Sequence, residues 1–178
     1  MTEETSLFEN LKSCADRFVA ANIYKVLPEI GMNIAYNVGG NDPEDVWDIP
    51  GRIRRVEKEC CYVREPKKGG SEYMAGTLLA LRKKFPQVQC VANLRSNEKI
   101  LAACRELDFQ MVDMPTPPGY WQRGNDFFVD LEKVIEGCDE LPDVITVPDR
   151  INLEKLILMV SADIEDFADK VLALNSMV

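Results

Sequence analysis

The sequence contains no histidine, and its six cysteines form no C-x-x-C pair. The usual zinc-binding spacings therefore cannot be built, and we expect no metal site of that kind. No run approaches the roughly 18 consecutive apolar residues of a membrane span. The polar, acidic start, MTEETSLFEN, is also unlike a signal peptide. We expect a soluble cytoplasmic protein with reduced thiols and no membrane partner.

Positive charge is also scarce, because 21 lysines and arginines stand against 30 aspartates and glutamates, for a net charge of −9. This balance opposes broad binding to nucleic acids or anionic membranes, so we expect no direct nucleic-acid binding by this chain. Basic residues nevertheless concentrate between positions 52 and 68, among them Arg52, Arg64 and Lys68. They predict either a basic pocket for a compact anion or a solvated basic face.

The spacing of apolar residues predicts alternating helices and strands in one domain over residues 1–178. The predicted helices cover residues 6–25, 72–84, 97–107, 127–137 and 164–174. The predicted strands cover residues 32–38, 49–56, 59–65, 88–94, 109–114, 143–147 and 155–161, the second and third forming a hairpin. Segment 88–94 is almost continuously apolar, as in a central strand covered on both faces. The strand, helix, strand order over 88–114 predicts an α/β fold with a mixed, partly parallel sheet.

The segment REPKKGGSEYMAG, residues 64–76, has the composition of an anion site ahead of a helix. Gly69 and Gly70 let the backbone turn tightly, and Lys68 adds a positive charge. Ser71 can cap the helix and leave several N–H groups pointing outward. The same residues also suit an ordinary loop before a capped helix, so the motif alone does not decide between the two.

Arg95 follows the predicted central strand, at the carboxyl edge where open α/β sheets hold ligands. It is a candidate ligand residue or, in the simpler interpretation, one partner of a surface ion pair. Residues 114–125 are rich in proline and glycine and carry Tyr120 and Trp121. They are predicted to form a loop that acts as a lid over this edge, or an apolar patch for a protein partner.

Five separated pieces resemble one family in order and spacing. They are NIAYNV, DVWDIPGRI, GGSEYMAG, VANLRSN and PDVI followed by LEKLILMVSADIEDF. Together they resemble the archaeal-type thiamine-phosphate synthase (ThiN) domain over nearly the whole chain. The resemblance implies a three-layer α/β/α sandwich. It also implies either an enzyme that joins hydroxymethylpyrimidine diphosphate to thiazole phosphate with release of pyrophosphate, or a related sensor domain fused behind a DNA-binding segment.

The resemblance also implies site residues. The family's Pro-Gly-Arg-Ile piece is intact around Arg52, and its Asn-Ile-Arg piece is matched by Asn93 and Arg95, while Asn33 opens the first matching piece. Arginine suits phosphate because its planar fork donates two hydrogen bonds and stays charged. The resemblance thus assigns Asn33, Arg52, Asn93 and Arg95, with Lys68 and the Gly69 to Ser71 turn, to a phosphate site.

Two positions depart from the family pattern. The enzymes carry a histidine two residues after the serine of the glycine turn, where this sequence has Tyr73. Tyrosine has an ordinary pKa of about 10 and is a poor proton carrier near neutrality. The family's Gly-Lys-Glu-Pro piece reads Asn152-Leu153-Glu154-Lys155 here, so its glycine and lysine are gone.

These departures predict a degenerate, sensor-like domain that binds thiamine monophosphate or a phosphorylated precursor, because binding demands less than catalysis. The alternative is an active synthase in which Tyr73 and Arg95 are catalytic. Such an enzyme would use Mg²⁺, with Asp45 or Asp48 as candidate ligands that sequence does not separate from surface acids. A third hypothesis is another ligand or a purely protein-binding role, and a homodimer is a further expectation.

Overall fold

A single mixed sheet forms the centre of the protein. The computed structural model describes residues 2–116, 126–150 and 153–178. Within them seven strands follow the order β5–β2–β1–β6–β9–β8–β7. They are β1 (Ile34–Tyr36), β2 (Trp47–Asp48), β5 (Lys67–Lys68), β6 (Cys90–Arg95), β7 (Met111–Asp113), β8 (Val144–Val147) and β9 (Leu156–Ser161). The predicted hairpin is confirmed as a separate pair, β3 (Arg54–Val56) with β4 (Glu59–Cys61).

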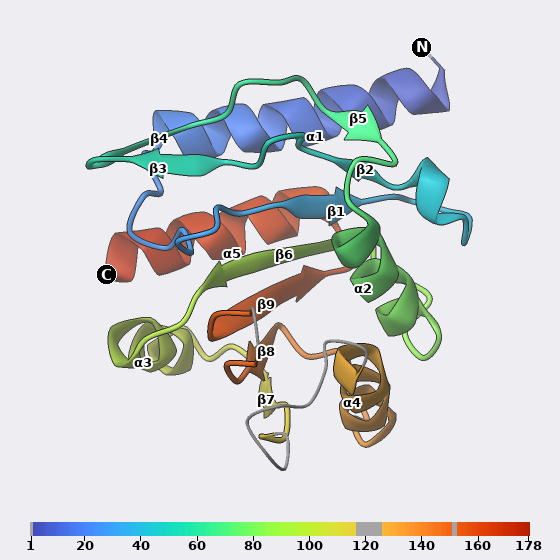
Figure 1. The fold of residues 1–178 in the computed structure, drawn as a ribbon, viewed down its shortest axis with the longest axis vertical. Helices are drawn as coiled ribbons and strands as arrows, with labels where there is room; N and C mark the ends of the chain where they lie inside the picture. The colour runs from blue at the N-terminus through green and yellow to red at the C-terminus, as the bar shows by residue number, and fades with distance from the viewer. Residues whose placement is uncertain (1, 117–125, 151–152) are drawn as a thin grey trace.

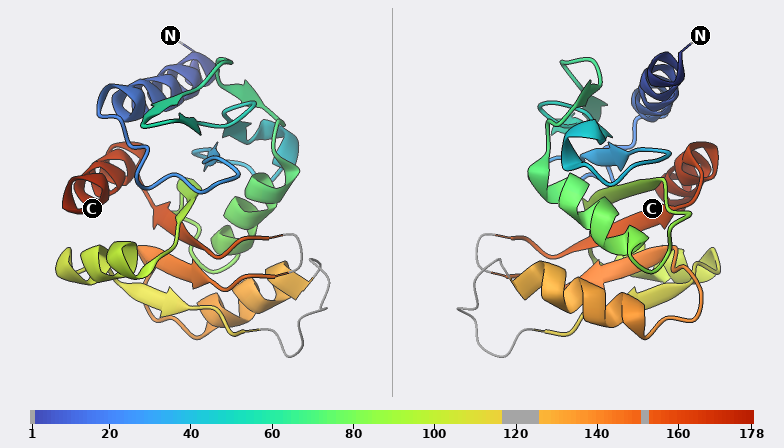
Figure 2. Two further views of the ribbon diagram at one scale, coloured as in Figure 1. Left: turned by 60° about the vertical axis from the view of Figure 1, so that its left-hand side comes forward. Right: turned by 90° about the vertical axis from the view of Figure 1, so that its right-hand side faces the viewer.

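Helices cover both faces of this sheet (Figure 1 and Figure 2). One face carries α1 (Glu3–Ala20), α3 (Glu98–Glu106) and α5 (Ile164–Met177), and the other carries α2 (Glu72–Arg82) and α4 (Asp126–Glu136). Successive side chains of β9 alternate between the two cores: Ile157 and Met159 pack with the first set of helices, and Leu158 and Val160 with the second. The predicted three-layer α/β/α sandwich is confirmed.

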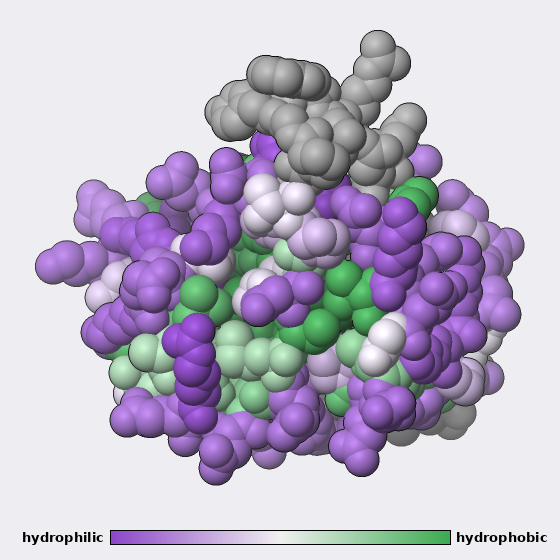
Figure 3. All heavy atoms as spheres, turned by 90° about the horizontal axis from the view of Figure 1, so that it is seen from below, coloured by the Kyte–Doolittle hydropathy of each residue, from purple (hydrophilic) through white to green (hydrophobic). Residues whose placement is uncertain are grey.

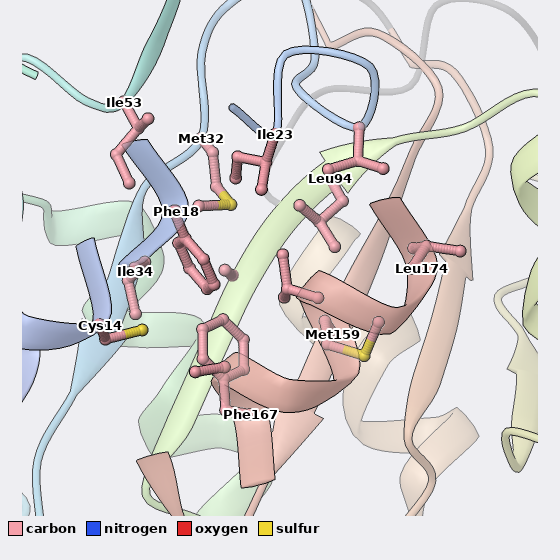
Figure 4. Packing of buried hydrophobic residues seen from close by; sticks show 14 of the residues in the cluster. Cys14, Phe18, Ile23, Met32, Ile34, Ile53, Leu94, Met159, Phe167 and Leu174 are labelled. Carbon is pink, nitrogen blue, oxygen red and sulfur yellow. The ribbon is translucent and has the colours of Figure 1, made fainter. Parts of the chain in front are cut away.

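The larger core joins α1 and α5 to the sheet (Figure 4). Phe18 and Phe167 meet edge to face, with ring centroids 6.0 Å apart, and Cys14 and Ile34 pack beside them. Burial raises the pKa of the Cys14 thiol, so this cysteine stays neutral and acts as a small apolar side chain. All six cysteines are free.

Strand direction departs from a simple parallel arrangement. Strand β6 is central, as predicted, and five of its six residues are buried. The chain leaves β6 through α3 and returns in β7, but β9 and β8 are inserted between these two strands. The parallel pairing predicted from the sequence is found between β7 and β8, whereas β9 runs antiparallel to both β6 and β8. The sheet is therefore mixed and mostly antiparallel.

Side chains cap the starts of the helices. Ser71 caps α2, as predicted, and Asp163 caps α5, since their side chains accept hydrogen bonds from the first turns of these helices. The Asn97 carboxamide oxygen caps α3 by accepting from the Ile100 N–H at 2.9 Å, so this helix begins at Glu98, one residue later than predicted. Helix α1 ends at Ala20, before the predicted residue 25, because Asn22 takes a left-handed conformation with φ of 51°.

The surface at the β7 end of the sheet has an apolar centre and a hydrophilic border. Seen from below, apolar side chains gather in the middle of this face and hydrophilic ones surround them (Figure 3). Among the residues that the structure describes, no helix combines the length and the apolar character needed to cross a membrane.

Arg82 ties the end of α2 to two loops. Its side chain is buried and donates to the main-chain oxygens of Val88 at 2.7 Å, Gly40 at 2.9 Å and Asn37. Burial lowers the pKa of this guanidinium, and carbonyl groups replace the water it has lost. We expect Arg82→Met to lower the free energy of unfolding by about 2–3 kcal/mol, since it leaves buried carbonyls without donors.

Urea denaturation measures this effect, and Lys83→Met is the matched control. The Lys83 side chain is 66% exposed and pairs with Glu132 on the surface, so its loss should cost less than about 1 kcal/mol. Equal losses in the two variants would contradict a structural role for Arg82.

Candidate functional site

A cavity of about 440 Å³ opens on the α2 and α4 face of the sheet. It lies where β6 ends and β9 begins, beside the first turns of α2 and α4. Its lining combines apolar and polar side chains, namely Ile30, Asn33, Arg52, Ser71, Tyr73, Met74, Asn93, Phe127, Arg150, Leu153 and Leu156. A concave, mostly apolar site with a few converging polar groups is the usual form of a small-molecule site.

Residues predicted from separate parts of the sequence meet in this cavity. They are Asn33 before β1, Arg52 before β3, Ser71 and Tyr73 at the start of α2, and Asn93 in β6. The antiparallel pairing of β1 with β6 brings Asn33 and Asn93 together, since their neighbours Ile34 and Ala92 lie opposite each other.

Asn33 and Asn93 build the polar wall of the cavity. Asn93 accepts from the Asn33 N–H at 2.8 Å and donates to the Gly31 carbonyl at 3.1 Å. The Asn33 carboxamide oxygen accepts from the Ile49 N–H at 3.0 Å. Both residues are nearly fully buried. Their carboxamides are engaged with the protein itself, so they hold the loops around the site in place.

Arg52 enters the cavity from a strained turn. Its φ is +69°, in the left-handed region that residues other than glycine rarely adopt, at a cost of about 1 kcal/mol or more. Two hydrogen bonds hold this conformation: the Arg52 N–H donates to the Ile49 carbonyl at 2.9 Å, and its Nη1 donates to the Ile30 carbonyl at 3.0 Å. The turn thus directs the Arg52 guanidinium toward the cavity, where the Ile30 carbonyl holds its Nη1 atom in place.

Tyr73 stands on the first turn of α2 against two aromatic rings. Its ring lies 4.9 Å from Phe127 and 5.7 Å from Phe128, centroid to centroid. Its hydroxyl is buried and has no hydrogen-bond partner in the part of the chain that the structure describes. Burial raises the pKa of Tyr73, and the positive charge of Arg150 opposes this rise. The hydroxyl therefore stays protonated at neutral pH, where it can donate a hydrogen bond to a ligand.

Arg150 is the site residue that the sequence analysis missed. Its side chain is 1% exposed and its Nη2 donates to Asp130 of α4 at 2.8 Å. Its Nε and Nη1 are buried without a partner among the described residues, and its guanidinium lies 5.9 Å from the centre of the Phe127 ring. A buried, charged donor with unfilled hydrogen bonds is costly unless a ligand satisfies it.

A signal for Arg150 was present in the sequence. Arg95 is the last residue of β6, and Arg150 comes three residues after the end of β8. Both strands end at the same edge of the sheet, because each runs antiparallel to β9. Arg150 therefore lies at the same edge of the sheet as Arg95, the edge where open α/β sheets hold ligands.

Arg95 and Lys68 lie outside the cavity lining. Arg95 borders a second hollow with Tyr24, Lys25, Arg55 and other residues near the start of α3. Lys68 pairs with Glu4 and with Asp45, the latter at 3.5 Å. Arg95 is thus available to an anion at a different place on the surface, whereas Lys68 already has carboxylate partners.

The glycine turn before α2 faces a carboxyl group. Asp48 is 2% exposed, and a methyl group on Gly70 would stand 2.5 and 2.7 Å from its two oxygens. Burial raises the pKa of Asp48, while the Gly70 and Ser71 N–H groups and the Asn33 carboxamide beside it oppose the rise. Gly70 is therefore required here by the close approach of Asp48.

The two carboxylates considered for Mg²⁺, Asp45 and Asp48, lie outside the cavity lining. Asp48 faces the glycine turn and Asp45 lies beside Lys68. Across residues 2–116, 126–150 and 153–178, no three aspartate, glutamate or cysteine side chains come together to hold a metal ion. Tyr120 and Trp121, and with them most of the predicted lid, lie outside the described residues.

Comparison with known proteins gives a match over most of the chain. The sequence model of the family described as "Thiamine-phosphate synthase ThiN" matches residues 10–173. A protein of Methanothermobacter thermautotrophicus with the same name is 25% identical over 169 residues, covering 90% of this chain and 88% of that protein.

Solved structures support the fold. The C-terminal domain of a phosphomethylpyrimidine kinase superposes with a TM-score of 0.84 at 22% identity, covering 97% of this chain and all of that one. An L-fuculose-1-phosphate aldolase from Thermus thermophilus superposes with a TM-score of 0.53 at 7% identity, covering 97% and 91% of the two chains. At these identities the likeness is one of fold alone.

Proposed function

The chain belongs to the ThiN family of thiamine-phosphate synthases, and on that premise we propose that its cavity binds thiamine monophosphate or one of the phosphorylated pyrimidine and thiazole precursors. We propose further that it does so without efficient turnover, as a sensor-like domain. The ligand's phosphate lies against Arg150 and Arg52, and its ring lies against Tyr73 and Phe127.

The observation that carries the proposal is the unfilled Arg150 guanidinium. Its Nε and Nη1 are buried beside a cavity that a second arginine also lines. A phosphate oxygen would satisfy these donors with charge-assisted hydrogen bonds, which are about twice as strong as neutral ones. Tyr73 and Phe127 next to them supply a flat apolar wall, and aromatic faces attract cationic rings such as a thiazolium.

Tyr73 supports binding over turnover. The family enzymes, by resemblance, have a histidine at this position, and a histidine can exchange a proton near neutral pH. The raised pKa of Tyr73 removes that ability, and no other described side chain that lines the cavity is an acid or a histidine. The proposed site therefore retains donors for a phosphate and lacks a group that transfers protons.

An active synthase is the competing function, favoured by the name of the relative with 25% identity. Two assays on one preparation separate the alternatives. Calorimetric titration with thiamine monophosphate should give saturable binding. Pyrophosphate release from hydroxymethylpyrimidine diphosphate and thiazole phosphate should be slower than for a histidine-containing family enzyme by roughly 10²- to 10⁴-fold, the usual contribution of a general acid or base.

Turnover equal to that of the histidine-containing relative would contradict the sensor-like hypothesis and leave the synthase. An absence of both binding and turnover in folded protein would remove the thiamine assignment itself.

A further inference from the structure

We propose that Glu154 is a positioning residue that holds Ile30 at the mouth of the cavity and thereby slows the release of the ligand. This inference rests on the proposed function, because it concerns the same cavity. Ile30 lines the cavity and is 41% exposed, so it stands at the boundary between the site and solvent. Glu154 lies outside the lining and acts on the main chain of the loop that carries Ile30.

The Glu154 carboxylate accepts hydrogen bonds from two successive main-chain groups of this loop. One of its oxygens accepts from the Ile30 N–H at 2.9 Å, and the other accepts from the Glu29 N–H at 3.3 Å. Such charge-assisted hydrogen bonds are about twice as strong as neutral ones. Glu154 and Ile30 are 124 positions apart in the sequence, so this contact joins two distant segments of the chain.

The same loop is also held by its carbonyl groups. The Ile30 carbonyl accepts from Arg52 Nη1 at 3.0 Å, and the Gly31 carbonyl accepts from Asn93 Nδ2 at 3.1 Å. A hydrogen bond from the Gly31 N–H to the Pro28 carbonyl at 3.0 Å closes the turn itself. Main-chain hydrogen bonds therefore set the position of the loop, and Glu154 receives the two that its exposed part donates.

The segment that contains Glu154 also lines the cavity. Leu153 and Leu156 are part of the lining, and two main-chain hydrogen bonds of 2.9 and 3.0 Å join Leu153 to Arg150. Glu154 therefore links the part of the wall that carries Arg150 to the loop that carries Ile30. Without this link we expect the loop to open more often. The ligand should then leave sooner, because differences in affinity at one site arise mostly from the dissociation rate.

The test measures the dissociation rate of thiamine monophosphate by surface plasmon resonance. Glu154→Ala removes both acceptors and should raise this rate at least about tenfold over the wild type. Glu154→Gln conserves the shape and one acceptor oxygen, so its rate should lie between the two, and it serves if Glu154→Ala does not fold. Glu29→Gln is the matched control, because it removes the same charge from an exposed side chain of the same loop and keeps the Glu29 N–H. It should release the ligand at the wild-type rate.

A double variant separates a positioning role from a general loss of stability. Ile30→Ala shortens the wall itself and should also raise the dissociation rate. If Glu154 acts through Ile30, adding Glu154→Ala to Ile30→Ala should raise the rate further by less than about threefold, whereas independent effects would multiply. In the ligand-free protein, hydrogen exchange of the Ile30 amide should be at least about tenfold faster in Glu154→Ala than in the wild type.

Melting curves establish that each variant is folded. The role of Glu154 would be overturned by a wild-type dissociation rate in folded Glu154→Ala, by an equal increase in Glu29→Gln, or by effects that multiply in the double variant. A wild type that binds no thiamine monophosphate would overturn the proposed function, and this inference with it.

Discussion

Replacing Arg150 with methionine is expected to weaken the binding of thiamine monophosphate by about 10²- to 10⁴-fold. The change removes a buried charge and two donors, Nε and Nη1, that no described residue uses. Charge-assisted hydrogen bonds are each worth roughly 1.5–3 kcal/mol, so the loss of two accounts for the expected factor. Methionine conserves the length of the apolar stem against Phe127 and so limits the loss of packing.

Two further variants make this result specific. Arg150→Met leaves Asp130 unpaired. The double variant Asp130→Asn, Arg150→Met removes that partly buried charge, and its affinity should be equally low. Arg105→Met, on the exposed side of α3 and outside the cavity, should bind as the wild type does. Calorimetric titration measures all of them, and wild-type affinity in folded Arg150→Met would contradict the proposed site.

Arg95→Met discriminates between the two hollows. The sequence predicts Arg95 as a ligand residue, and the structure places it beside Tyr24 and Lys25. If Arg95→Met loses binding while Arg150→Met keeps it, the phosphate belongs to that second hollow.

Replacing Tyr73 with histidine is expected to raise pyrophosphate release by up to roughly 10²- to 10⁴-fold, the contribution of a well-placed general acid or base. The side chain would start from the same turn of α2 and face the same cavity. Burial and the neighbouring positive charge of Arg150, which act on Tyr73 now, would both lower the pKa of a histidine there. If the histidine acts as an acid, the gained rate should fall as the pH rises through that lowered pKa.

Tyr73→Phe is the matched control, because it retains the ring against Phe127 and Phe128 and removes only the hydroxyl. It should gain no turnover and should bind thiamine monophosphate more weakly by about 0.5–1.5 kcal/mol, the worth of one hydrogen bond. If folded Tyr73→His binds the ligand and releases no pyrophosphate, a missing histidine does not explain the predicted lack of turnover.

The sequence predicts the helices well because their apolar residues repeat with a clear period, and the central strands well because they are continuous apolar runs. The continuous apolar run that ends in β6 and the strand KLILMVS, observed as β9, are examples. Strand β2 is not predicted, since two residues, Trp47 and Asp48, are too few to show a period and Pro50 follows closely. The position of β9 between β6 and β8 depends on pairing between distant segments, which periodicity does not report.

The sequence predicts only part of the candidate site, because part of it depends on contacts between distant segments. Asn33, Arg52, Tyr73 and Asn93 lie in short motifs, and the fold brings them together. The carboxylates beside the glycine turn come from β2 and the segment before it, so only tertiary contact reveals that Asp48 faces Gly70. Arg150 stands in no matched motif. Its place after the strand at residues 144–147 is a signal that the sequence contains, but its burial and unfilled donors, which single it out, appear only in the structure.

A crystal structure of the protein with thiamine monophosphate tests the central claim most directly. The account predicts a phosphate oxygen within hydrogen-bond distance of Arg150 Nε or Nη1, a second contact to Arg52, and a ligand ring against Tyr73 and Phe127. A ligand seated beside Arg95 and Tyr24, or an empty cavity at saturating ligand, would contradict it.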